Sequence, residues 1–133
     1  MISKKQQAAV LARNPIYTLS MHTEKMNGLV LPLFELVRSY ILSLHNSVQE
    51  VPKQKYIGYK APEYFVFIQA MEFKLKVFLK LDPGRVTHIP GKTRDVSSIA
   101  HFATGDLECI VRSKEDMAWL EPLIAKSYKT VEQ

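Results

Sequence analysis

Three lysines and one phenylalanine alternate along a single short segment in the middle of the chain. Lys74, Lys76, Phe78 and Lys80 occupy every second position, and side chains at that spacing lie on one face of a β-strand. Ammonium groups in such a row can follow a phosphate backbone while the aromatic ring stacks on a base. The pattern predicts a surface for nucleic acid. Lysines that only keep a solvated strand soluble give the same pattern.

Further candidate binding residues lie on either side of this segment. Upstream, we expect a neighbouring strand to widen the surface with Tyr56, Tyr59 and Lys60, and Lys55 lies beside it. Downstream, the cations Arg85, Lys92 and Arg94 surround it. A second cluster could instead converge on a polar ligand in the segment 94–106, and its members are Arg94, Asp95, His101 and Asp106.

No catalytic or metal-binding arrangement is recognisable elsewhere. The four histidines lie on different predicted elements, and one cysteine leaves zinc without its usual sulfur ligands. Ser97, His101 and Asp95 are residue types found in hydrolases, but no glycine-flanked nucleophile turn accompanies them. Cys109 alternates with apolar neighbours and is expected to be a buried, inert thiol. We therefore favour a non-enzymatic protein and expect no catalytic residue, no metal and no cofactor.

A small set of elements must position the candidate residues. Apolar residues at spacings of three and four predict a helix from about Leu31 to Leu44. A second helix is expected from Ser113 onward, kinked or restarted at Pro122. A long surface loop is expected from Arg85 to Phe102. Strands are predicted over Tyr56–Lys60, Tyr64–Gln69, Phe73–Leu81 and Leu107–Arg112.

This order of elements predicts an α+β domain. We expect an antiparallel sheet of three to four strands, covered by an N-terminal and a C-terminal helix. With 133 residues the chain has room for one such domain, over residues 23–133, preceded by a loosely ordered arm over residues 1–22. The absence of a long apolar run argues against a membrane span or a secretion signal, and the single cysteine is typical of a reducing compartment. A cytoplasmic location is therefore expected.

Positive charge is concentrated in the middle third of the chain. Nine cations and three carboxylates lie between Val51 and Arg94, a net charge of +6 compared with +5 for the whole chain. A field concentrated in this way attracts phosphate backbones or acidic partners.

Several blocks of the sequence resemble a known family. The blocks are Lys55–Lys60, Phe65–Ile68, Lys74–Leu79, Arg94–Ser97, His101–Asp106 and Leu123-Ile124 with Tyr128. They are similar to an uncharacterised prokaryotic domain labelled "predicted transport protein", and to modules appended to restriction-type nucleases and other DNA-targeting proteins. The similarity covers about residues 29–128. Where the family tends to have Gly-His-Trp-Gly, this chain has Ala100-His101-Phe102-Ala103, and the loss of both glycines removes backbone freedom there.

The resemblance implies no catalytic residues, and its transport label finds no support in the sequence. Its association with DNA-targeting proteins agrees with the basic segment. The leading hypothesis is an accessory module that binds nucleic acid or a nuclease-type partner through the lysine-bearing strand face. The alternative is a small-ligand or protein-interaction domain centred on residues 94–106. A homodimer that hides Phe78 is a third interpretation.

Overall fold

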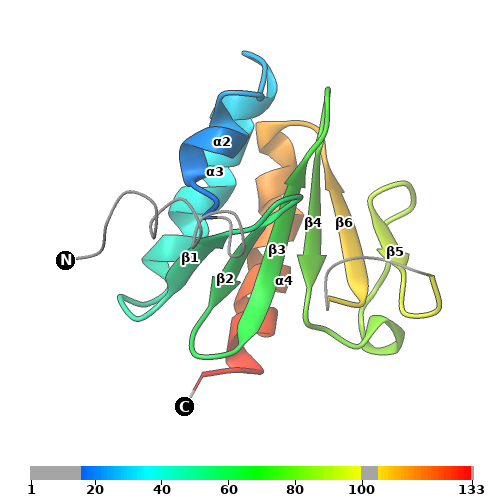
Figure 1. Cartoon of the computed structure of the whole chain (residues 1–133). Coiled ribbons are helices and arrows are strands. Elements are labelled where there is room, and N and C mark those ends of the chain that lie inside the picture. Colours follow the sequence, from blue (N-terminus) through cyan, green and yellow to red (C-terminus); the bar gives the residue numbers. More distant parts are fainter. Residues whose placement is uncertain (1–15, 100–104, 133) are drawn as a thin grey trace.

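A six-stranded antiparallel sheet forms the centre of the molecule (Figure 1). The computed structural model describes residues 16–99 and 105–132. The strands follow the order β1-β2-β3-β4-β6-β5 across the sheet, and every neighbouring pair is antiparallel. They span Gln49–Pro52 (β1), Ile57–Lys60 (β2), Tyr64–Ala70 (β3), Leu75–Leu79 (β4), Thr93–Asp95 (β5) and Leu107–Val111 (β6).

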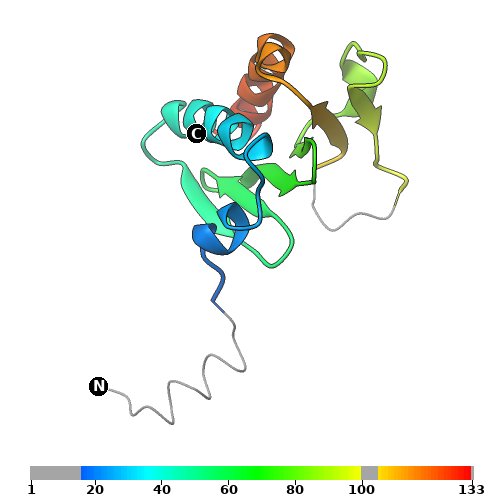
Figure 2. The same cartoon turned by 90° about the horizontal axis from the view of Figure 1, so that it is seen from above.

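Two long helices cover the same face of this sheet. α3 (Val30–Ser43) and α4 (Met117–Lys129) both lie on one side of the strands, as the view from above shows (Figure 2). The short helix α2 (Leu19–Thr23) lies next to the β1–β2 turn, where Nε2 of His22 is 2.6 Å from the carbonyl oxygen of Lys53. Two 3-10 turns, η1 (Pro83–Arg85) and η2 (Lys114–Asp116), complete the described elements.

The strand register assigns each side chain to one of two faces. On β4, Leu75, Val77 and Leu79 face the helices and are fully buried. Their partners on β3 and β6 join them in the main core, together with the inward sides of α3 and α4. Lys76 and Phe78 alternate with them and belong to the opposite face. We call this second face, turned away from α3 and α4, the outer face.

The predicted α+β class is confirmed, but the sheet has six strands instead of three or four. The two strands missing from the prediction, β1 and β5, both lie at edges of the sheet. β1 ends in Pro52, and β5 has three residues inside the segment expected to be a loop. Edge strands tolerate proline, charge and short length because one side of their backbone needs no partner. Such strands leave little hydrophobic pattern to detect.

The predicted helices occur at the expected places. α3 spans Val30–Ser43, within one residue of its predicted bounds. Ser113 and Asp116 form the expected capping box, and α4 follows directly. Pro122 does not end the helix: α4 continues through it to Lys129. The carbonyl that loses its hydrogen bond belongs to Ala118, which is exposed and can bond to water.

Of the arm predicted over residues 1–22, residues 1–15 lie outside the described part of the chain. Its last part forms α2, which begins after Thr18. The Thr18 hydroxyl accepts a hydrogen bond from the backbone N–H of Met21. The described end of this segment is therefore helical from Leu19 onward.

Candidate nucleic-acid interface

The outer face carries an aromatic cluster at its centre. Tyr64 stacks on Phe67 with ring centroids 5.2 Å apart, and Tyr56 meets Phe67 edge-on at 5.1 Å. Phe67 is almost fully buried, whereas the two tyrosines are half-buried. Tyrosine rings held in this way by an aromatic neighbour form a rigid platform on which a flat group can stack.

The position of the Tyr64 ring depends on a glycine in the neighbouring strand. A Cβ atom at Gly58 would lie 2.7 Å from Cε1 and 2.9 Å from Cδ1 of Tyr64. The ring therefore lies directly against the backbone of β2, in the space that any other residue would fill. Glycine in a strand often marks such a close approach by a neighbouring group.

Cations border the aromatic cluster on both sides. Nζ of Lys60 lies 5.5 Å from the centre of the Tyr64 ring, within the range of a cation–π contact. On the other side, Lys76 of β4 and Arg94 of β5 approach Glu108 of β6 at 4.0 and 3.1 Å. Glu108 is 5% exposed, so its charge lies beneath this part of the surface and is balanced by the two cations.

Two of the predicted binding residues do not reach the surface of the outer face. Phe78 points toward it but is only 4% exposed, because it packs in a second hydrophobic cluster with Phe67 and Val96. The expectation that its ring stacks on a base is therefore wrong. Tyr59 lies on the opposite face, fully buried among the core residues, and its hydroxyl donates to Glu50 at 2.8 Å.

The remaining predicted lysines lie at the ends of strands instead of in one row. Lys74 lies in the β3–β4 turn, and Lys80 follows β4 and forms a salt bridge with Glu63 at 2.8 Å. The neighbouring Phe73, the first residue of the predicted strand Phe73–Leu81, is 64% exposed in the same turn. The row of lysines is interrupted because β4 contains only Leu75–Leu79, so Lys74 and Lys80 lie outside the strand.

Salt bridges hold much of the positive charge of the middle third. Five of its nine cations pair with carboxylates: Lys76, Lys80, Arg85, Lys92 and Arg94. Within residues 16–99 and 105–132, the other four form no salt bridge: Lys53, Lys55, Lys60 and Lys74. Lys53, Lys55 and Lys74 belong to the β1–β2 and β3–β4 turns, which adjoin at one end of the antiparallel sheet.

The candidate ligand cluster of residues 94–106 comes together only in part among the described residues: Asp95 and Asp106 line one hollow of about 470 Å³, and Arg94 is not in its described lining. Arg94 binds Glu108, whereas Asp95 accepts hydrogen bonds from the backbone N–H and the hydroxyl of Ser97. These bonds lower the pKa of Asp95. The backbone carbonyl of Asp106 accepts from the Val96 N–H. His101 lies outside the described residues, so its predicted binding role stays a prediction.

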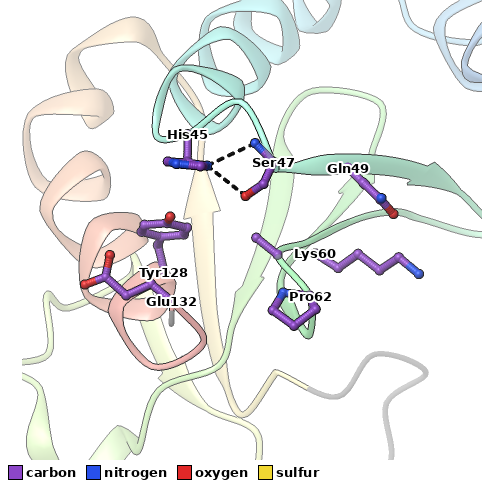
Figure 3. Close-up of a pocket in the computed structure, with 8 residues that line it drawn as sticks. His45, Ser47, Gln49, Lys60, Pro62, Tyr128 and Glu132 are labelled. Atoms are coloured by element: carbon purple, nitrogen blue, oxygen red, sulfur yellow. Dashed lines mark hydrogen bonds between the residues drawn. The ribbon is translucent and has the colours of Figure 1, made fainter.

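A separate hollow of about 760 Å³ opens between the end of α4, the end of α3 and β2 (Figure 3). His45 and Ser47 face each other there, with Oγ of Ser47 2.8 Å from Nδ1 of His45. The backbone N–H of Ser47 donates to the same nitrogen at 3.0 Å. Nδ1 is therefore an acceptor that closes the short loop after α3. In the described chain no carboxylate orients this ring, so the pair lacks the third member of a hydrolytic triad.

Other classes of site leave no trace in the described residues. Residues 16–99 and 105–132 contain no group of three His, Cys, Asp or Glu side chains that could hold a metal ion. Among the same residues, no helix combines the length and apolar character needed to cross a bilayer.

Comparison with known proteins places the chain in a family without assigning it an activity. Residues 22–131 match the family described as "Domain of unknown function (DUF5655)", and the chain belongs to this family. An "Uncharacterized protein" of Haemophilus influenzae is 22% identical over 126 residues, which cover 95% of this chain and 42% of that protein. The chain thus spans less than half the length of this relative. No solved structure matches.

Proposed function

We propose that this domain is a non-enzymatic module that binds single-stranded nucleic acid on the outer face of its sheet. The observation that carries the proposal is the pair of half-buried tyrosine rings, Tyr56 and Tyr64, supported by Phe67 and bordered by Lys60. Bases of a single strand are unstacked and can lie on such rings, while ammonium groups contact the phosphates.

The shape of the surface favours a single strand over a duplex. The aromatic rings lie on a sheet face, and a duplex keeps its base faces stacked inside the helix. Stacking on side chains therefore requires bases that are already unpaired. The likeness to modules of DNA-targeting proteins, noted in the sequence, supports the same class of ligand by analogy. The greater length of the relative agrees with a module that acts beside other segments, and a nuclease-type partner belongs to this proposal.

Fluorescence anisotropy with a labelled oligonucleotide of about 10 nucleotides tests the proposal. We expect binding at low salt that weakens as salt rises, because bound counterions are released. The Tyr64→Leu variant, which keeps an apolar cover over Phe67, should bind several-fold to about a hundredfold more weakly, as expected for about 1–3 kcal/mol of lost stacking.

A pair of charge variants separates specific contacts from overall charge. Lys60→Gln with Lys74→Gln removes two cations that form no salt bridge among the described residues, and should weaken binding and flatten its salt dependence. Lys114→Gln with Lys126→Gln makes the same change in net charge on exposed residues of η2 and α4, away from the outer face. Absence of binding at low salt to single and double strands would refute the proposal. An equal loss in both double variants would also contradict it.

A further inference from the structure

A second hollow, of about 610 Å³, lies at the end of the sheet where two hairpin turns meet the segment between α2 and α3. We call it the hairpin-end hollow. Its polar lining consists of His22, Lys25, Gln54, Lys55, Gln69 and Glu72, and Asn27 also borders it. Its lysines, Lys25 and Lys55, lie outside the predicted strand Phe73–Leu81, and only the folded chain brings them together.

Hydrogen bonds fix the walls of this hollow without using its lysines. Nε2 of His22 donates to the carbonyl oxygen of Lys53 at 2.6 Å, which attaches α2 to the β1–β2 turn. Oδ1 of Asn27 accepts the N–H groups of Leu29 and Val30, each at 3.0 Å, and its Nδ2 donates to the carbonyl oxygen of Glu72. Asn27 thereby attaches the start of α3 to the β3–β4 turn.

The charge of the hollow favours an anion. Lys25 and Lys55 form no salt bridge within the described residues, and Lys53 and Lys74 lie in the turns that form its walls. Among the described residues that line the hollow, Glu72 is the only one with a carboxylate. Cations therefore outnumber carboxylates, and a doubly charged anion gains more from this excess than a singly charged one.

The hollow is continuous with the aromatic part of the outer face. Gln69, in its lining, belongs to the outer face and pairs with Lys76 on β4. Lys55, also in its lining, directly precedes Tyr56, whose ring packs on Phe67. A strand stacked on the two tyrosines therefore has the hollow at the end of its path.

We propose that the hairpin-end hollow binds the terminal phosphate of a single strand held on the outer face, an inference that rests on the proposed function. An internal phosphodiester carries one negative charge, whereas a terminal phosphate monoester carries between about 1.5 and 2 at neutral pH. The ammonium groups of Lys25 and Lys55 distinguish the terminal phosphate from an internal phosphodiester, because they attract the more highly charged group more strongly. The amides of Gln54 and Gln69 supply hydrogen-bond donors beside these ammonium groups.

The test compares three oligonucleotides of one sequence, labelled at an internal base. One has hydroxyl groups at both ends, one has a 5′-phosphate and one a 3′-phosphate. We expect one phosphorylated strand to bind the full chain roughly tenfold more tightly than the hydroxyl strand, as one additional charge-assisted hydrogen bond provides. The end that gives the gain defines the polarity of the bound strand.

Lys25→Gln with Lys55→Gln should abolish this gain while the hydroxyl strand still binds. The double variant Lys114→Gln and Lys126→Gln serves as the control and should keep the gain. Equal binding of all three strands, or a gain that survives the loss of Lys25 and Lys55, overturns the inference but leaves the proposed function standing. Failure of all three strands to bind overturns both.

A nucleoside monophosphate provides the last arm of the test. If it displaces the phosphorylated strand at a concentration equal to that of the strand, the hollow binds a free nucleotide and the inference is overturned. If displacement needs a large excess, the strand on the outer face contributes to the affinity, as the inference requires.

Discussion

Replacing Asp116 by asparagine should destabilise the domain in a pH-dependent way. The Asp116 carboxylate is 3% exposed and accepts four hydrogen bonds. Its donors are Nζ of Lys92 (2.6 Å), the backbone N–H groups of Arg112 (2.8 Å) and Ser113 (3.2 Å), and Nε1 of Trp119 (2.9 Å). Together they join the segment before β5, the end of β6 and the beginning of α4.

The magnitude follows from the pKa of this carboxyl group. Burial by itself raises the pKa of Asp116, but the hydrogen bond from Lys92 and the three other donors lower it to about 2, compared with an ordinary value of 3.8. The difference corresponds to about 2 kcal/mol of folding free energy. Because the unfolded chain binds the proton more readily, this contribution is complete above about pH 5 and is lost as the pH falls toward 2.

Urea unfolding followed by far-UV circular dichroism at several pH values measures the effect. We expect Asp116→Asn to lower the free energy of unfolding by about 2 kcal/mol at neutral pH, with the difference from the parent narrowing between about pH 5 and pH 2. Glu115→Gln, which makes the same charge change at the exposed neighbouring position, should have little effect. A difference that stays constant over this range would refute the electrostatic reasoning.

Two further predictions concern the core. Gly105→Ala should destabilise the domain by about 1–3 kcal/mol, because the added Cβ would lie 2.8 Å from the backbone nitrogen of Leu79. Gly28→Ala is the control, because a Cβ at Gly28 would meet nothing within 4 Å. Equal unfolding free energies for the two variants would contradict the steric argument. Burial, with a smaller effect from Glu108, raises the pKa of the Cys109 thiol to about 12, so alkylation by iodoacetamide should require unfolding, and rapid labelling of the native protein would show this to be wrong.

The parts of the fold that could be predicted are those with a strong hydrophobic period. The stripe along α3 and the alternation of Leu75, Val77 and Leu79 directly reflect burial against the core. β1 and β5 escaped prediction because an edge strand is stabilised by the backbone of its neighbour and needs no apolar side. Of the kink or restart expected at Pro122, the restart does not occur, because α4 continues through this residue. The cost of a proline in a helix depends on whether the orphaned carbonyl reaches water, which the sequence does not record.

The candidate site was harder to predict because the sheet face on which a side chain lies does not determine whether that side chain is exposed to solvent. Alternation placed Phe78 on the correct side of β4, but this residue is buried by packing with Phe67 and with Val96, which directly follows β5. Tyr64 and Phe67 are three residues apart, so simple alternation along a strand would place them on opposite faces of the sheet. They share the outer face because the pairing of β2 with β3 shifts its register between Tyr59 and Lys60. The contact of the Tyr64 ring with Gly58 depends on the same register, so neither feature could be predicted from the sequence.

Glu108 limits where a strand of nucleic acid can gain affinity. In the sequence it lies outside the basic segment, yet in the fold it lies beneath the outer face between Lys76 and Arg94. If phosphates drew both cations away, a buried carboxylate would be left unpaired at a cost of at least about 1–3 kcal/mol. The β5–β6 side is therefore a weak place for phosphate, despite its cations. Among the cations of the middle third, those that form no salt bridge within the described residues lie beside Tyr64 and at the hairpin end. The favourable path therefore runs from Lys60 along the tyrosines to Lys55.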